Sequence, residues 1–257
     1  MQKLTIIKVG GKVVEEKESL NQLLNDFAKV SGPKILVHGG GRSATAMAER
    51  LGIETKMIDG RRITDAPMLE VVTMVYGGLV NKGVVAGLQA LGQNALGLTG
   101  ADLNIIKSKK REHPTIDYGF VGDIEKVDAT AIDNLLKTDA VPVIAPLTHD
   151  GKGNMLNTNA DTMAASVATA MSQLYKVTLV FCFEKQGVLS DTNDENSVIP
   201  HITPELFQKL KNEKVIIEGM IPKLENGFNA LDKGVSKIRI TNTEGISDDK
   251  KGTLLTK

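Results

Sequence analysis

Short runs of β-branched and other apolar residues alternate along the chain with longer stretches of helical periodicity. Six of the short runs are expected strands, at residues 4–9, 35–37, 95–98, 141–144, 177–183 and 237–240. They are nearly continuous apolar segments, which is typical of strands covered on both faces of a parallel sheet. The alternation of strand and helix therefore predicts an α/β fold built on a layered sheet.

The helical stretches carry recognisable start and stop signals. Leu20, Leu23, Leu24 and Phe27 repeat at helical spacing, and Gly32-Pro33 follows as a stop signal. A further helix is expected to start near Asp65, a side chain able to cap it, with proline in the first turn. Two more starts are expected, one at Asp128 and one at Asn159 or Asp161.

The 257 residues permit one large domain or two closely joined lobes. Charged residues thin out between 141 and 175 and become frequent again from 184 onward, and no linker rich in Pro, Gly or Ser intervenes. We therefore expect an N-terminal lobe over residues 1–175 and a C-terminal lobe over 176–257.

Composition excludes several function classes. Lys plus Arg and Asp plus Glu both total 31, so the basic excess of a typical nucleic-acid-binding protein is missing. The single cysteine, Cys182, lies in an apolar run and is expected to be a buried small hydrophobe. No run approaches the about 18 apolar residues of a membrane span, and no secretory signal is evident. The expected location is the reducing cytoplasm.

Two glycine-rich loops each follow an expected strand. The first is Lys8-Val9-Gly10-Gly11-Lys12, and its continuation into Val13 excludes a Walker P-loop. The second contains Gly39, Gly40 and Gly41 directly before a helix, and clustered backbone donors at such a place suit a phosphate or carboxylate. Together the loops favour an anion site, although a Gly-Gly turn alone can be a plain tight turn.

Two further elements carry charged residues with an ambiguous role. Asn159 and Asp161 are either simple helix caps or functional groups. Lys223 opens a helix, where a cation opposes the helix dipole, so it is either functional or merely solvated. His38 has a catalytic interpretation, but the support of its glycine loop by hydrogen bonding is favoured.

These elements, in this order, resemble the amino acid kinase family over nearly the whole chain. The resemblance rests on six motifs, at residues 7–11, 38–41, 60–64, 97–100, 157–161 and 219–223. It implies a three-layer αβα sandwich with a central, mostly parallel sheet and two lobes. The implied activity is transfer of the γ-phosphoryl group of ATP to the side-chain carboxylate of N-acetyl-L-glutamate or a close N-acyl analogue, in arginine biosynthesis.

The resemblance also implies roles for individual residues near the transferred group. Lys8 and Lys223 would neutralise charge on the phosphoryl group, and Asp161 would hold the two lysines. Gly10 and Gly11 would bind the phosphoryl group through backbone N–H groups. The acyl amino acid would be held by four residues in the N-terminal lobe, namely Gly40, Gly41, Arg62 and Asn157.

The C-terminal lobe would hold the nucleotide. The residues implied near adenine and ribose are Glu184, Lys185, Gly187, Val188, Leu189, Val215, Ile216 and Ile217. The chain departs from the family pattern at two places: Glu184-Lys185 stands where Asp-Val is usual in the nucleotide contact, and Glu218 precedes the second lysine in a local loop change. Mg²⁺ is expected to arrive with ATP, and no metal site of the protein itself is expected.

The chemistry agrees with these roles on physical grounds. A glutamate side chain has a reference pKa of about 4.3 and is ionised at neutral pH, so no general base is required. Bringing an anion to a polyanion instead requires cations and oriented donors. The alternatives are glutamate 5-kinase, aspartate kinase or UMP kinase of the same family, and a non-catalytic sensor of amino acids or nucleotides. The chain is also expected to form a homodimer, with residues 67–89 as a surface that could equally be buried within one chain.

Overall fold

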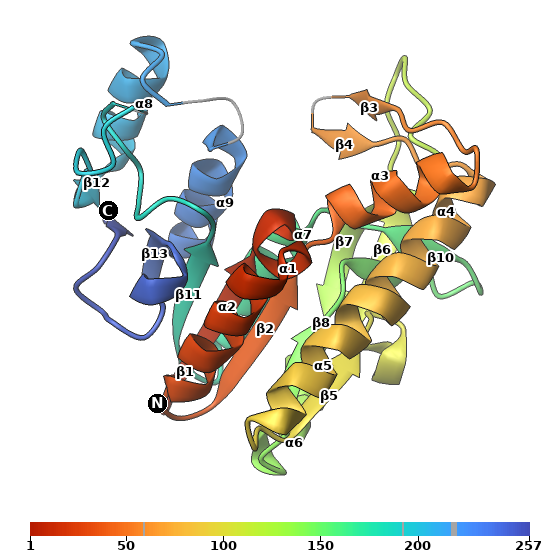
Figure 1. Ribbon diagram of the computed structural model, residues 1–257, viewed down its shortest axis with the longest axis horizontal. Helices are drawn as coiled ribbons and strands as arrows, with labels where there is room; N and C mark the ends of the chain where they lie inside the picture. Colours follow the sequence, from red (N-terminus) through yellow and green to blue (C-terminus); the bar gives the residue numbers. More distant parts are fainter. Residues whose placement is uncertain (59, 192, 217–219) are drawn as a thin grey trace.

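The computed structural model describes residues 1–58, 60–191, 193–216 and 220–257. Its centre is an eight-stranded sheet in the order β12-β14-β13-β11-β1-β2-β8-β5, with helices on both faces (Figure 1). This is a mixed α/β fold with a large, mostly parallel sheet, so the predicted fold class is confirmed.

The six expected strands form one uninterrupted parallel block of this sheet. They are β1 (Lys3–Val9), β2 (Lys34–His38), β5 (Ala95–Leu98), β8 (Val141–Ile144), β11 (Lys176–Cys182) and β13 (Lys237–Thr241). Each lies within one residue of its predicted bounds, because continuous apolar runs are the strongest strand signal a sequence contains.

Eight further strands in the described ranges were not predicted. They are β3 (Met57–Ile58), β4 (Arg61–Arg62), β6 (Ile106–Lys110), β7 (Gly122–Val127), β9 (Leu147–His149), β10 (Met155–Asn157), β12 (His201–Ile202) and β14 (Thr253–Leu255). β14 pairs with β13 in the antiparallel sense and β12 extends the sheet beyond it. β10, β9, β6 and β7 form a separate four-stranded sheet, and β3 and β4 form a hairpin.

Two helical layers cover the central sheet. The helices are α1 (Gly11–Glu15), α2 (Lys17–Lys29), α3 (Gly41–Arg50), α4 (Ala66–Val72), α5 (Asn81–Ala90), α6 (Ala129–Lys137), α7 (Ala160–Met171), α8 (Pro204–Asn212) and α9 (Ile221–Asp232). A π-helical segment, Thr73–Val80, joins α4 to α5. The predicted caps are confirmed at Asp65, Asp128 and Asn159, each of which accepts a backbone N–H three residues on.

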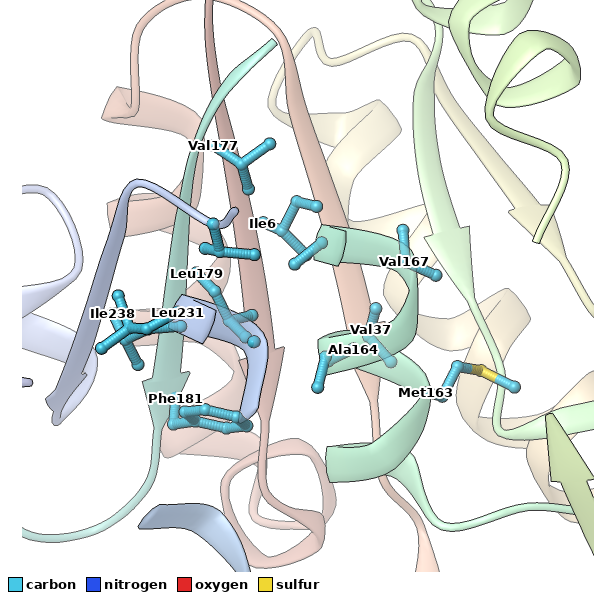
Figure 2. Packing of buried hydrophobic residues seen from close by; sticks show 14 of the residues in the cluster. Ile6, Val37, Met163, Ala164, Val167, Val177, Leu179, Phe181, Leu231 and Ile238 are labelled. Carbon is cyan, nitrogen blue, oxygen red and sulfur yellow. The ribbon is translucent and has the colours of Figure 1, made fainter. Parts of the chain in front are cut away.

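Successive strand residues point to opposite layers and so build two cores. Ile6 and Val37 face α7, and Figure 2 shows Val37 beside Ala164 of α7 and Leu231 of α9 beside Ile238 of β13. Ile7 and the residues paired with it on the neighbouring strands face the opposite layer, which is formed by α2, α3 and residues 66–90. Lys8 shares the face of Ile6, and this alternation directs its side chain toward the start of α7.

The helical stretch Ala66–Ala90 is apolar and long enough to cross a membrane by length and composition alone. Charged and polar residues interrupt it, so it contains no uninterrupted apolar run and was not predicted as a possible span. In the folded protein 44% of the most apolar 18-residue part of this stretch is buried. Val71, Val75, Val84 and Leu88 belong to the core. A buried core helix passes the same test as a membrane span, so the stretch is adequately explained by its packing.

Candidate active site

The two glycine loops meet at one edge of the central sheet. β1 and β2 are parallel neighbours, so the loops that follow them leave the sheet at the same end. The two loops are so close that a Cβ atom on Gly39 would lie 3.0 Å from the Gly11 nitrogen. Close backbone approach therefore favours glycine at position 39, and the two predicted anion loops lie directly against each other.

A single carboxylate bridges the two predicted lysines. Asp161 lies in the first turn of α7, with Oδ1 2.8 Å from Lys8 Nζ and Oδ2 3.3 Å from Lys223 Nζ. Lys8 comes from the end of β1 and Lys223 from the first turn of α9. The structure thus brings together three residues separated by up to 215 positions in sequence, through the packing of α7 and α9 on the same face of the sheet.

The bridge is largely withdrawn from water. The side chains of Lys8 and Asp161 are 8% and 10% exposed, and that of Lys223 is 19% exposed. Burial alone would raise the pKa of Asp161, but the charges of Lys8 and Lys223 outweigh it and hold that pKa below its ordinary value. Asp161 is consequently an anion, and the three side chains together carry one net positive charge beside the glycine loops.

A cavity of about 180 Å³ opens beside the second glycine loop. It is lined by all four residues expected to hold the acyl amino acid, Gly40, Gly41, Arg62 and Asn157. The buried Asn157 amide donates to Thr64 Oγ1 at 2.9 Å, which fixes the orientation of its side chain.

The Arg62 guanidinium is positioned by neutral acceptors. Its Nη2 donates to the Gly41 carbonyl at 2.8 Å and to Thr45 Oγ1 at 2.9 Å. Arg62 is 8% exposed, and within the described part of the chain no carboxylate lies at ion-pair distance from it. A buried cation held in this way suits an anionic ligand in the cavity, for which a guanidinium offers a bidentate contact.

A second, mostly apolar cavity of about 90 Å³ lies in the C-terminal part of the chain. It is lined by Phe183, Lys185, Gly187, Val188, Leu189, Val215, Ile216 and Met220. Six of these were expected near the nucleotide. Glu184 does not line this cavity but a neighbouring hollow that also contains Lys12 and Asn242. The remaining expected residue, Ile217, lies outside the described residues.

His38 is fully buried beneath the second glycine loop. Its Nδ1 is 2.7 Å from the Gly39 carbonyl, and Asn81 Nδ2 lies 3.1 Å from Nε2 and also donates to the Val143 carbonyl at 2.9 Å. Burial lowers the pKa of His38 to about 4, against a smaller raising effect of the Gly39 hydrogen bond. The ring is therefore neutral, with Nδ1 donating to Gly39 and Nε2 accepting from Asn81.

Three residues that sequence reasoning missed also shape the site. Tyr76, in the π-helical segment, packs so closely on Gly40 that a Cβ there would lie 2.9 Å from the Tyr76 ring. Arg61 lines the same cavity as Arg62. Glu15 of α1 accepts the backbone N–H of Ser43 at 2.7 Å. These contacts join segments that are distant in sequence, and no local sequence pattern predicts them.

Within the described ranges, no group of three or more His, Cys, Asp or Glu side chains is arranged to hold a metal ion. The charged groups of the site are ammonium and guanidinium groups with two carboxylates among them, Asp161 between the two lysines and Glu15 at the start of α3. Chemically, this arrangement can bind and neutralise anions, and its neutral histidine takes no part in the cluster of charges.

Comparison with known proteins gives a consistent result. The model of the amino acid kinase family matches residues 3–242. A protein of Bacteroides thetaiotaomicron named acetylglutamate kinase is 63% identical, with 100% of this chain and 99% of that protein covered. One of Methanopyrus kandleri with the same name is 38% identical, at 98% and 100% coverage.

Solved structures show the same fold. The protein smu.665 of Streptococcus mutans superposes with a TM-score of 0.81 at 28% identity, covering 98% of both chains. Carbamate kinase of Giardia lamblia bound to AMP-PNP gives a TM-score of 0.72 at 13% identity, covering 100% of this chain and 99% of that one. The second likeness speaks for the fold alone.

Proposed function

The chain belongs to the amino acid kinase family, and we propose that it transfers the γ-phosphoryl group of ATP to the side-chain carboxylate of N-acetyl-L-glutamate or a close N-acyl analogue. The products would be an N-acylglutamyl 5-phosphate and ADP, in the second step of arginine biosynthesis. Full-length relatives named acetylglutamate kinase support this assignment.

One observation carries the proposal: the Lys8–Asp161–Lys223 bridge lies beside the joined glycine loops. Phosphoryl transfer depends chiefly on positioning and on stabilising charge that spreads over the transferring group. Two ammonium groups held by one carboxylate supply that charge in a site with little water, where electrostatic interactions are strong. The glycine backbone supplies N–H donors without side chains in the way.

In the proposed reaction the ionised substrate carboxylate attacks the γ-phosphorus directly. A bond forms between a carboxylate oxygen and phosphorus, while the bond from phosphorus to the β,γ-bridging oxygen breaks and its electron pair leaves with ADP. No proton is transferred, so no general base is needed. Lys8 and Lys223 would stabilise the charge on the moving group, and Asp161 would keep both ammonium groups in position.

The substrates would enter from the two lobes. Arg62 and Asn157, with the backbone of Gly40 and Gly41, would hold the acyl amino acid in the 180 Å³ cavity of the N-terminal lobe, residues 1–175. The apolar cavity around Val188 and Ile216 would take the adenine ring in the C-terminal lobe, residues 176–257. Mg²⁺ would enter as part of the nucleotide substrate, because phosphate oxygens are ligands it prefers.

We further propose that the enzyme works in the cytoplasm as a homodimer. Met74 and Leu79, 55% and 63% exposed, form an apolar surface on the helical stretch 66–90 that a second copy could cover. The homodimer is argued from this surface and from the resemblance to the family.

A coupled assay of ADP release with Mg-ATP and N-acetyl-L-glutamate tests the function directly. Turnover that depends on both substrates is expected, and it would exclude a non-catalytic sensor. N-succinyl-L-glutamate, L-glutamate, L-aspartate and UMP form the comparison panel. Activity confined to L-glutamate, L-aspartate or UMP would overturn the substrate assignment, while preference for the succinyl compound would change only the acyl group.

A further inference from the structure

Glu15 connects the two glycine loops through a single hydrogen bond. It is the last residue of α1, the short helix that begins with Gly11 of the first loop. Its Oε1 accepts the backbone N–H of Ser43 at 2.7 Å, and Ser43 lies in the first turn of α3, directly after the second loop. The contact spans 28 residues of sequence.

The start of α3 needs such a partner. The cap position is Gly40, which has no side chain to accept a hydrogen bond, and Ala44 is the first residue whose N–H returns to the Gly40 carbonyl. The N–H groups of Gly41, Arg42 and Ser43 consequently have no acceptor within the helix. Glu15 takes the one on Ser43, and its negative charge suits the positive end of the helix dipole.

The placement of Glu15 is not explained by stability alone. Its second oxygen, Oε2, is buried and has no hydrogen-bond partner among the described residues. Burying a carboxylate oxygen without a partner costs free energy, as does holding a negative charge beside a site for anions. Such a cost is typical of functional positions, where a group is placed for what it orients.

The geometry leaves little freedom between the loops. A Cβ on Gly39 would lie 3.0 Å from the Gly11 nitrogen and 3.4 Å from Gly11 Cα, closer than most contacts that a Cβ atom makes. A shift of the first loop would therefore press on the second or draw Glu15 away from Ser43. The Glu15 side chain and the close backbone contact therefore make the position of one loop depend on the position of the other.

We propose that Glu15 is a positioning residue that fixes the two glycine loops as one unit, so that nucleotide bound at the first loop orders the second for the acyl amino acid. This inference rests on the proposed function, which assigns the first loop to the phosphoryl group and the second to the acceptor. Glu15 does not line the cavity assigned to the acyl amino acid, and it acts by setting the direction of the Gly41 and Arg42 N–H groups.

Three variants test the proposal. Glu15→Ala removes the acceptor, Glu15→Gln keeps an oxygen for the Ser43 N–H without the charge, and Glu18→Ala removes an exposed carboxylate of α2 as a control. We expect Glu15→Ala to lower kcat about 10- to 100-fold, because a misplaced acceptor loses its line of attack. Glu15→Gln should retain activity within about threefold, and Glu18→Ala should match the parent protein.

Binding measurements separate positioning from general damage. Calorimetry gives the Kd of N-acetyl-L-glutamate with and without the non-hydrolysable nucleotide AMP-PNP, and the ratio of the two constants measures coupling between the loops. The parent protein should bind the amino acid more tightly with nucleotide present, and Glu15→Ala should lose that gain. Equal coupling in the parent and in Glu15→Ala would overturn the proposal.

A further measurement covers the case in which Glu15→Ala does not fold. In the parent protein, hydrogen exchange at residues 40–44 should slow when AMP-PNP binds, although that segment belongs to the acceptor loop. Unchanged exchange there would also overturn the proposal. Absence of turnover with any acyl glutamate would instead contradict the proposed function, so the two failures are distinguishable.

Discussion

The two lysines of the site differ from surface lysines because a buried carboxylate holds both ammonium groups in place. Asp161 meets Lys8 at 2.8 Å and Lys223 at 3.3 Å, and both ammonium groups are mostly shielded. Lys223 occupies the first turn of α9, where a cation opposes the helix dipole, so local helix stability does not account for it. The proposed role in charge neutralisation would account for it.

Replacement of either lysine by alanine should therefore impair chemistry more than binding. We expect kcat to fall by about 100-fold or more for Lys8→Ala and Lys223→Ala, with KM values changed much less, because the lost charge acts mainly on the transition state. Steady-state kinetics of both substrates measures this. Lys209→Ala, an exposed lysine of α8, is the control. Near-normal turnover in either variant would remove that lysine from the mechanism.

His38 illustrates a residue whose role is decided by its buried surroundings. In the folded protein its pKa is about 4, against an ordinary value of 6.5, so only the unfolded chain binds a proton between these two values. Stability supplied by the neutral ring is complete above pH 6.5 and is lost as the pH falls toward 4. The loss approaches about 3 kcal/mol, from about 1.4 kcal/mol per pKa unit.

Urea unfolding at pH 7.5 and pH 4.5 should show this loss in the parent protein. Acidic groups titrate in the same range, so the comparison is with His38→Gln, in which the histidine contribution is absent. The stability difference between the two proteins should shrink on acidification. A difference that is independent of pH would show that the ring is not held neutral.

Sequence identified some site residues and not others for a physical reason. Lys8, Asp161 and Lys223 stand in short motifs at element ends, where their type and neighbours are unusual. Glu15, Tyr76 and Asn81 look like ordinary helix residues, and their importance arises from contacts with segments 28 to 62 residues away. Tertiary contacts of this kind leave no pattern in one sequence.

At the scale of the element, the strands made of continuous apolar runs were predictable and the strands without such runs were not. β6, with the sequence Ile-Lys-Ser-Lys-Lys, buries only alternate residues and reads as a charged loop. The π-helical segment Thr73–Val80 also has no distinguishing composition, yet its register brings Tyr76 onto Gly40. Such segments are rare and occur often at functional sites.

Helix α2 shows how the end of a helix can be capped by a side chain from the strand that follows it. Lys34, buried at the start of β2, donates from Nζ to the carbonyls of Phe27, Ala28 and Val30 at 2.8 to 3.1 Å. These are terminal carbonyls of the helix, which lack partners within it. Burial lowers the pKa of Lys34, but the carbonyls and the negative helix end favour its charge.

Lys34→Met should consequently destabilise the protein while leaving the site intact. We expect a loss of about 2 kcal/mol, the typical contribution of hydrogen bonds made by a charged group, with kcat unchanged. Thermal or urea unfolding measures it, and Lys17→Ala at the exposed start of α2 serves as the control. A stability equal to the parent would mean that water satisfies those carbonyls equally well.

At the scale of the whole molecule, one sheet runs through both proposed lobes. β1 pairs with β2 on one side and with β11 on the other, so the boundary near residue 175 crosses no gap in the sheet. The six parallel strands were predictable from sequence, whereas their order was not, because the order depends on how helices pack between them. The site lies where this sheet joins the two parts.

The apolar surface at Met74 and Leu79 allows the proposed homodimer to be tested. Sedimentation of the parent protein should give twice the mass of one chain. Leu79→Asp should shift the protein toward the monomer, because a carboxylate buried in an apolar interface is unfavourable. Lys82→Glu, a charge change on the next turn, is the comparison. A monomeric parent protein would contradict the homodimer.

The central claim is that two ammonium groups from distant parts of the chain act together on one migrating phosphate. The most direct measurement is a crystal structure with Mg-ADP, aluminium fluoride and N-acetyl-L-glutamate, which imitates the transferring group. We predict the fluoride between the Gly10-Gly11 loop and the substrate carboxylate, with Lys8 and Lys223 both in hydrogen-bond contact and Asp161 still joining them. A fluoride bound elsewhere, or contacted by only one of the two lysines, would contradict the account.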